Sequence, residues 1–223
     1  KDYLINVRGI PEERIFVTGS PRHDSFFDVI KHEKNSQKTI LVTIPAIPEM
    51  NFISDTNSYI KLEHLLKKLF SIIKNLKKVN LIVKLHPVQD ANNEYIKKLI
   101  RKLDPNILIL QTGSIKEIIS SCDAMINLHV ELMPSTVLLE GLILKKPIMN
   151  IVMTNEILEF QFVKDNAVLS VTDNSDLENS INELLYNETT PKELIKNGQL
   201  HIKNFLANPG NASKSLADVI NSM

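Results

Sequence analysis

Short apolar runs alternate with longer amphipathic segments along almost the whole chain of 223 residues. Most of the short runs are apolar on both faces, which is typical of parallel strands that are covered from both sides. Parallel neighbours need crossover connections, and the amphipathic segments between the runs have the period of helices. The pattern therefore predicts an α/β fold built around one mostly parallel sheet.

The boundaries of the expected elements follow from this alternation. We expect strands at 15–18, 39–44, 80–85, 107–110, 124–127, 147–151 and 168–171, and helices at 59–76, 93–103, 115–121, 136–144 and 176–186. After Pro191 only helical periods remain. We predict a single doubly wound, Rossmann-like sheet with helices on both faces, formed by residues 1–190. Residues 191–223 are expected to form a helical C-terminal tail that packs on the same domain.

Composition excludes several classes of function. The 26 basic and 26 acidic side chains cancel, so the chain lacks the positive charge that attracts nucleic acids or anionic membranes. Cys122 is the single cysteine, which excludes an internal disulfide and fits a reducing compartment. No run approaches the roughly 20 apolar residues of a membrane span, and no signal peptide pattern is present. We expect a cytoplasmic protein with no nucleic-acid partner and no transmembrane segment.

Several familiar motifs are missing from the sequence. It contains no G-x-G-x-x-G, no G-x-x-x-x-G-K-[ST], no H-E-x-x-H and no G-x-S-x-G. Their absence argues against a typical dinucleotide enzyme, P-loop NTPase, zinc protease or α/β-hydrolase. His86 and His129 have no carboxylate or thiol at ligand spacing, so we predict no metal site. Because the chain opens with Lys1 and not with methionine, we also expect it to be part of a longer protein.

Ligands of an open parallel sheet bind beyond the carboxyl ends of its strands. His86 follows the strand predicted at 80–85, where an imidazole either donates to a phosphate oxygen or caps the strand end. Ser135 and Thr136 precede the helix predicted at 136–144. Two hydroxyls and the unpaired amides of a helix N-terminus form a cradle for an anion, with an ordinary N-cap at Ser135 as the alternative.

Glu140 lies four residues after Thr136 and therefore on the same face of the predicted helix. Its neighbours are nearly all apolar, and a carboxylate in such surroundings needs a hydrogen-bond donor. The diol of a ribose would supply two donors, although a backbone amide or a lysine such as Lys145 would serve as well. The sequence leaves these alternatives open.

A turn-rich stretch at 18–24 is a further candidate. Gly19 fits a positive φ there, and Asp24 is placed to cap the next helix. The stretch points to no particular function by itself.

Taken in order, five segments resemble the C-terminal domain of GT-B-fold enzymes. They read T-G-S-P-R-H-D at 18–24, K-L-H-P at 84–87, S-S-C-D-A at 120–124, P-S-T-V-L-L-E-G at 134–141 and K-P-I at 146–148. The resemblance covers about residues 1–172 and is strongest to capsule and surface-carbohydrate transferases with H-P and S-S/T motifs. These include bacterial sialyltransferases, Kdo transferases and CDP-glycerol glycerophosphotransferases. The chain is similar, more loosely, to the C-terminal half of UDP-N-acetylglucosamine 2-epimerases.

The resemblance implies a nucleotide-sugar donor as substrate, CMP-, CDP- or UDP-linked, and no further cofactor. By this resemblance, the donor phosphate would contact His86, Ser135 and Thr136. The ribose would contact Glu140, and the base would be flanked by Thr112 and Gly113 in the loop 110–116. It also implies that the general base and the acceptor site lie in an N-terminal domain of the full-length protein. Peripheral membrane contact would then come through the acceptor.

Three functions follow from these observations. The first is the donor-binding domain of a glycosyltransferase in surface polysaccharide or glycoconjugate synthesis. The second is an epimerase-like domain, which needs carboxylates and an arginine facing the sugar; Arg22 and Glu131 are the candidates. Ser135-Thr136 stands where the epimerases have a Gly-Gly pair, which favours transfer over epimerisation. The third is a nucleotide-binding module without catalytic activity.

Overall fold

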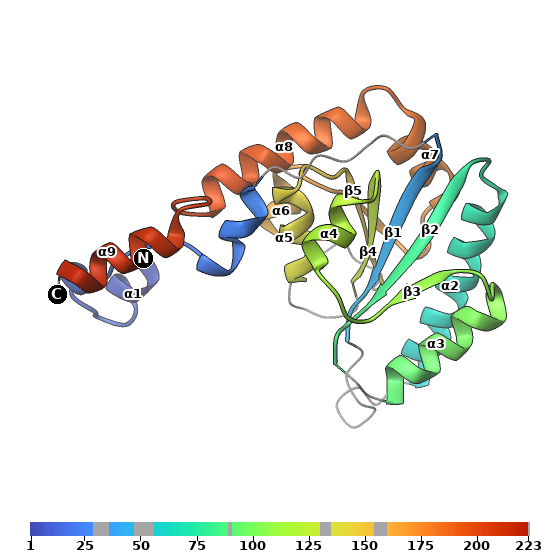
Figure 1. The fold of residues 1–223 in the computed structure, drawn as a ribbon, viewed down its shortest axis with the longest axis horizontal. Coiled ribbons are helices and arrows are strands. Elements are labelled where there is room, and N and C mark those ends of the chain that lie inside the picture. Colours follow the sequence, from blue (N-terminus) through green and yellow to red (C-terminus); the bar gives the residue numbers. More distant parts are fainter. Residues whose placement is uncertain (29–35, 47–55, 89–90, 130–134, 154–159, 223) are drawn as a thin grey trace.

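The computed structural model describes residues 1–28, 36–46, 56–88, 91–129, 135–153 and 160–222 (Figure 1). Within these residues six strands form one parallel sheet of order β3-β2-β1-β4-β5-β6. The strands are Lys38–Ile44 (β1), Val79–Leu85 (β2), Leu108–Leu110 (β3), Ala124–His129 (β4), Ile148–Val152 (β5) and Leu169–Thr172 (β6). The predicted single, parallel, Rossmann-like sheet is confirmed. The strand order reverses between β1 and β4, which is where ligands bind in folds of this type.

Helices connect the strands and cover both faces of the sheet. They are Asp2–Asn6 (α1), Thr56–Asn75 (α2), Ala91–Leu103 (α3), Ile115–Ser120 (α4), Thr136–Ile143 (α5), Gln161–Lys164 (α6), Leu177–Tyr186 (α7), Thr190–Phe205 (α8) and Ala212–Ser222 (α9), with short 3₁₀ helices at Glu12–Arg14 (η1) and Pro21–Phe27 (η2). Residues of α2, α3 and α7 share one apolar cluster with the sheet, and residues of α4, α5 and α6 share the other.

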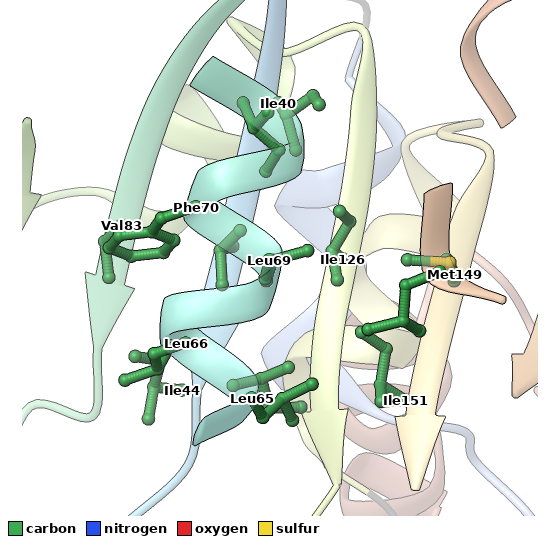
Figure 2. Packing of buried hydrophobic residues seen from close by; sticks show 14 of the residues in the cluster. Ile40, Ile44, Leu65, Leu66, Leu69, Phe70, Val83, Ile126, Met149 and Ile151 are labelled. Carbon is green, nitrogen blue, oxygen red and sulfur yellow. The ribbon is translucent and has the colours of Figure 1, made fainter. Parts of the chain in front are cut away.

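Alternating side chains of the strands build the two cores. On β1, Ile40 and Val42 face α2, whereas Leu41 faces the opposite side with α5. Figure 2 shows Leu69 of α2 packed over the strands on the first face. Because both faces of the central strands are buried, their sequences read as continuous apolar runs.

The segment 15–18 is not a strand, contrary to the sequence prediction. It precedes the sheet, and β1 already has β2 and β4 as its two neighbours. Phe16 and Val17 are 53% and 55% exposed, so the segment lacks the burial that strands of this sheet have. An apolar, β-branched run predicts a strand only when a partner strand is available to it.

The stretch at 18–24 ties the start of the chain to its C-terminal tail. Gly19 has the expected positive φ of 94°, and a Cβ there would lie 2.2 Å from the Ala207 carbonyl oxygen. Asp24 lies inside η2 and does not cap the next helix of the chain. Its carboxylate accepts from the amides of Ala212 and Ser213 at 3.0 and 2.7 Å, and therefore caps α9. Hydrogen bonds from the side chain and then the backbone of Ser213 lower the pKa of Asp24.

Gly141 allows α5 to lie close to the sheet. A Cβ at this position would approach Met125 Sδ to 2.5 Å and Ile148 Cδ1 to 2.9 Å. We expect Gly141→Val to lower the free energy of unfolding by about 2 kcal/mol, because core residues must move to admit the side chain. Urea denaturation measures the loss. Thr136→Val, at an exposed position of the same helix, is the control, and equal effects of both variants would contradict close packing at Gly141.

Candidate functional site

A cavity of about 410 Å³ opens at the carboxyl ends of β1, β2 and β4, beside the N-terminus of α5. Residues far apart in the sequence meet around it. The predicted site residues that line the cavity are Arg22, His86, Thr112, Gly113, Ser135, Thr136 and Glu140. Glu131 lies outside the described residues. The structure brings the other seven together, and the ligand contacts expected of each stay predictions.

Glu140 is a buried carboxylate on the cavity wall. Its side chain is 3% exposed, and Oε1 accepts a hydrogen bond from Arg22 Nη2 at 3.1 Å. Burial raises the pKa of Glu140, while the charges of Arg22 and Lys84 oppose that shift. The donor is therefore an arginine 118 residues away and not the neighbouring Lys145 that the sequence offered. A carboxylate oxygen accepts more than one hydrogen bond, so Glu140 retains capacity for ligand hydroxyls.

Ser135 occupies the N-cap position of α5, but its hydroxyl makes no capping hydrogen bond to the helix. Its backbone carbonyl accepts from Leu138 N–H at 3.2 Å. The alternative of an ordinary side-chain cap is therefore not realised here. Ser135 and Thr136 instead line the cavity at the positive end of the helix dipole, where an anion is stabilised.

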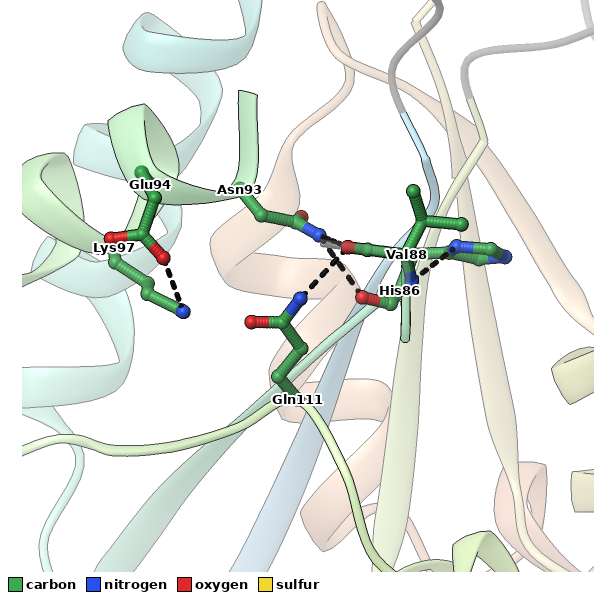
Figure 3. Close-up of polar contacts among 6 residues, drawn as sticks. All are labelled: His86, Val88, Asn93, Glu94, Lys97 and Gln111. Carbon is green, nitrogen blue, oxygen red and sulfur yellow. Dashed lines mark hydrogen bonds and ion pairs between the residues drawn. The ribbon is translucent and has the colours of Figure 1, made fainter. Parts of the chain in front are cut away.

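His86 is oriented by the chain that follows it (Figure 3). Its Nδ1 accepts a hydrogen bond from Val88 N–H at 3.3 Å, so in the neutral ring Nε2 carries the proton and is a donor. Asn93 Nδ2 donates to the His86 carbonyl at 3.1 Å, and Gln111 Nε2 donates to the Val88 carbonyl at 2.8 Å. These contacts link the end of β2 to the start of α3 and to the loop after β3.

Lys84 is a cavity residue that the sequence prediction missed. It is 7% exposed, and its Nζ donates to the carbonyls of Leu85 and Gln111 at 2.7 and 2.8 Å. Burial lowers the pKa of Lys84, and the carboxylate of Glu140 opposes the shift. A lysine within the apolar end of β2 was the available signal, because a buried ammonium group needs acceptors.

A row of polar side chains crosses the sheet beneath the cavity. Lys84, Thr43, Asn127 and Asn150 occupy paired positions on β2, β1, β4 and β5. Thr43 Oγ1 donates to Asn127 Oδ1 at 2.9 Å, and Asn127 Nδ2 donates to Asn150 Oδ1 at 2.7 Å. Thr43 and Asn127 also line the cavity, so it has a polar, hydrogen-bonding floor.

A groove of about 680 Å³ lies elsewhere, at the amino ends of the strands, where Thr39, Asn80 and Leu108 are among its lining residues. Ligands of parallel α/β sheets bind at the carboxyl ends, which favours the smaller cavity as the functional site. In the described part of the chain, no group of three or more His, Cys, Asp or Glu side chains is arranged to hold a metal ion. The helices described there also include none that is long and apolar enough to cross a membrane.

No protein-family model matches the chain, and no curated protein matches its sequence. Solved structures do share its fold. S. aureus MnaA, solved with UDP, is 15% identical with a TM-score of 0.65, and the match covers 96% of this chain and 56% of MnaA. A candidate UDP-N-acetylglucosamine 2-epimerase from Listeria monocytogenes is 12% identical with a TM-score of 0.63, and the match covers 97% and 55% of the two chains.

The C-terminal domain of a group 1 glycosyltransferase, LpcC of Francisella tularensis, is 13% identical with a TM-score of 0.52. That match covers 76% of this chain and 86% of the LpcC domain. The chain spans a little over half the length of MnaA and of the Listeria protein. Its fold is thus that of one half of a GT-B-type protein, as glycosyltransferases and sugar-nucleotide epimerases contain it.

Proposed function

We propose that the chain is the donor-binding half of a glycosyltransferase that uses a nucleotide-activated sugar or polyol phosphate. The observation that carries this proposal is the cavity, which combines the N-terminus of α5, two hydroxyls, a histidine donor and a buried carboxylate. These groups complement a phosphate on one side and a ribose diol on the other. Among CMP, CDP and UDP donors, the fold match to MnaA with UDP favours UDP as the first ligand to test.

The proposed chemistry is stabilisation of the nucleotide phosphate that leaves. The amides at the start of α5, the hydroxyls of Ser135 and Thr136 and the Nε2–H of His86 would donate to its oxygens as negative charge develops. Glu140 would accept from the ribose hydroxyls and orient the donor, and Thr112 and Gly113 would flank the base. A base that deprotonates the acceptor would come from an N-terminal domain of the full-length protein.

The biological setting that we propose is the synthesis of a capsule, another surface polysaccharide or a glycoconjugate, in the cytoplasm. Contact with the membrane would be peripheral and would come through the acceptor. We also keep the division into a sheet domain at 1–190 and a helical tail at 191–223 as part of this proposal.

An epimerase-like domain is the second candidate, because the fold matches both MnaA and the Listeria protein at TM-scores above 0.6. The hydroxyl pair Ser135-Thr136 argues against it, since the epimerase pattern has Gly-Gly there. Arg22, its candidate for contact with the sugar, pairs with Glu140 in this structure. Product analysis with the full-length protein separates the two. A released nucleoside mono- or diphosphate together with a new glycosidic or phosphodiester bond on an acceptor supports transfer, and inversion of one carbon of the nucleotide-linked sugar supports epimerisation.

Calorimetric titration with CMP, CDP, UMP and UDP tests the shared premise of nucleotide binding. We expect saturable binding that Ser135→Ala weakens by about three- to tenfold, since a neutral hydrogen bond contributes about 0.5–1.5 kcal/mol. His86→Ala is expected to weaken the binding of all four nucleotides by a similar factor, because each of them carries a phosphate. Ser121→Ala, at an exposed serine outside the cavity, is the matched control. Absence of binding to all four nucleotides would contradict the proposal.

A further inference from the structure

Lys84 is a buried cation that uses two of its three N–H donors within the part of the chain that the structure describes. An ammonium group has three N–H donors, and those of Lys84 reach two carbonyl oxygens, of Leu85 and Gln111. Both carbonyls stand at the carboxyl ends of strands, on the side where the cavity opens. Among the described residues no third acceptor is bonded to Lys84, so one N–H remains for an acceptor in or beside the cavity.

The charges around the cavity do not balance within the described residues. Arg22, Lys84 and Glu140 line it, and the single carboxylate is hydrogen-bonded to Arg22. Glu140 acts on Lys84 only through longer-range attraction, without a hydrogen bond between them. A buried ammonium without a paired anion costs free energy, which an anionic ligand in the cavity would recover.

The position of Lys84 indicates which part of a ligand it would meet. It precedes His86 by two residues, so both side chains leave the extended chain on the same side. Its partner Gln111 begins the loop that carries Thr112 and Gly113. Lys84 thus stands between the histidine that faces phosphate and the loop that flanks the base in the proposed function.

We infer that Lys84 is a binding residue for the diphosphate of the donor nucleotide, with its third N–H donating to a phosphate oxygen. This inference rests on the proposed function of the same cavity. The two carbonyls hold the ammonium group in place before the ligand binds. Binding therefore costs little conformational entropy of the lysine side chain. An adjacent ammonium also stabilises the negative charge that the leaving diphosphate gains.

Lys146 provides a matched control. Its Nζ also donates to two backbone carbonyls, of Ser120 at 2.8 Å and of Cys122, but the residue does not line the cavity. Lys84→Met and Lys146→Met therefore remove the same kind of group, one inside the cavity and one outside it. Lys84→Gln keeps an N–H donor for the carbonyls without the charge, and replaces Lys84→Met if that variant does not fold.

The experiment is calorimetric titration of each variant with uridine, UMP, UDP and inorganic pyrophosphate at constant ionic strength, with thermal unfolding as the check of folding. We expect Lys84→Met and Lys84→Gln to weaken UDP and pyrophosphate binding by about tenfold or more, as for a charged hydrogen bond. Uridine affinity should change less than about twofold in both variants, and Lys146→Met should change no affinity.

Equal weakening of uridine and UDP by the Lys84 variants would overturn the inference, because it would indicate a role in holding the loop after β3. UDP and pyrophosphate binding that survives both substitutions would also overturn it, while leaving the proposed function intact. Failure of the unaltered chain to bind any of CMP, CDP, UMP and UDP would instead contradict the proposed function, and the inference with it.

Discussion

Glu140→Gln is expected to weaken UDP binding by about 10- to 100-fold while leaving the free energy of unfolding at neutral pH unchanged or higher. A hydrogen bond to a charged acceptor contributes about 1.5–3 kcal/mol, and about 1.4 kcal/mol corresponds to a tenfold change in affinity. Glutamine has nearly the shape of glutamate, so the variant removes the charge that ribose hydroxyls would contact. Calorimetry with UDP measures the loss.

The unfolding half of this prediction follows from the pKa of Glu140. Burial raises that pKa in the folded chain above the ordinary value of 4.5, so ionisation of the buried carboxyl opposes folding. The contribution of protonated Glu140 to stability is complete below pH 4.5 and is lost as the pH rises through the folded-state pKa. Glutamine carries no such dependence, so the unfolding curves of variant and parent should converge as the pH falls toward 4.5.

The control for this variant is Glu117→Gln, which changes the same groups at an exposed position of α4. It should not alter UDP affinity, because Glu117 does not line the cavity. If Glu140→Gln binds UDP as tightly as the parent chain, the ribose contact assigned to Glu140 is wrong. A lower stability of Glu140→Gln at neutral pH would mean that the ion pair with Arg22 outweighs the burial of the carboxylate.

Much of the fold could be predicted from the sequence because strands that are buried on both faces appear in it as continuous apolar runs. The strands from β1 to β6 each begin and end within two residues of a predicted apolar run. The run at 15–18 has the same composition but no partner strand, and only the three-dimensional arrangement reveals that difference. The composition of a run indicates its tendency to be buried, whereas its pairing as a strand depends on whether another strand lies beside it in the fold.

The residues that line the cavity could be predicted from one rule, namely that the carboxyl ends of parallel strands lie at one edge of the sheet. The hydrogen-bond partners of these residues could not be predicted in this way. Arg22 and Glu140 are 118 residues apart, and Thr43 and Asn127 are 84 residues apart, so their pairing depends on helix placement and strand register. Register is fixed by the whole sheet and not by local sequence, which is why the polar row was missed.

Asn127→Ala tests that polar row and is expected to lower the free energy of unfolding by about 3 kcal/mol. Asn127 is 1% exposed, and its side chain links Thr43 to Asn150 through two hydrogen bonds. Each buried group that loses its partner costs about 1–3 kcal/mol, and the space left by the amide adds a further cost. Urea denaturation measures the change.

A partly exposed asparagine gives the contrast. Asn197 lies on α8 and donates to the Asn166 carbonyl at 3.2 Å. Asn197→Ala should change the free energy of unfolding by less than about 0.5 kcal/mol. A double-mutant cycle of Asn127→Ala with Thr43→Val should give a coupling energy of about 0.5–3 kcal/mol, because the two residues share a hydrogen bond. Additive losses of unfolding free energy would show that Thr43 and Asn127 act independently. Packing alone would then stabilise the arrangement of the cavity floor.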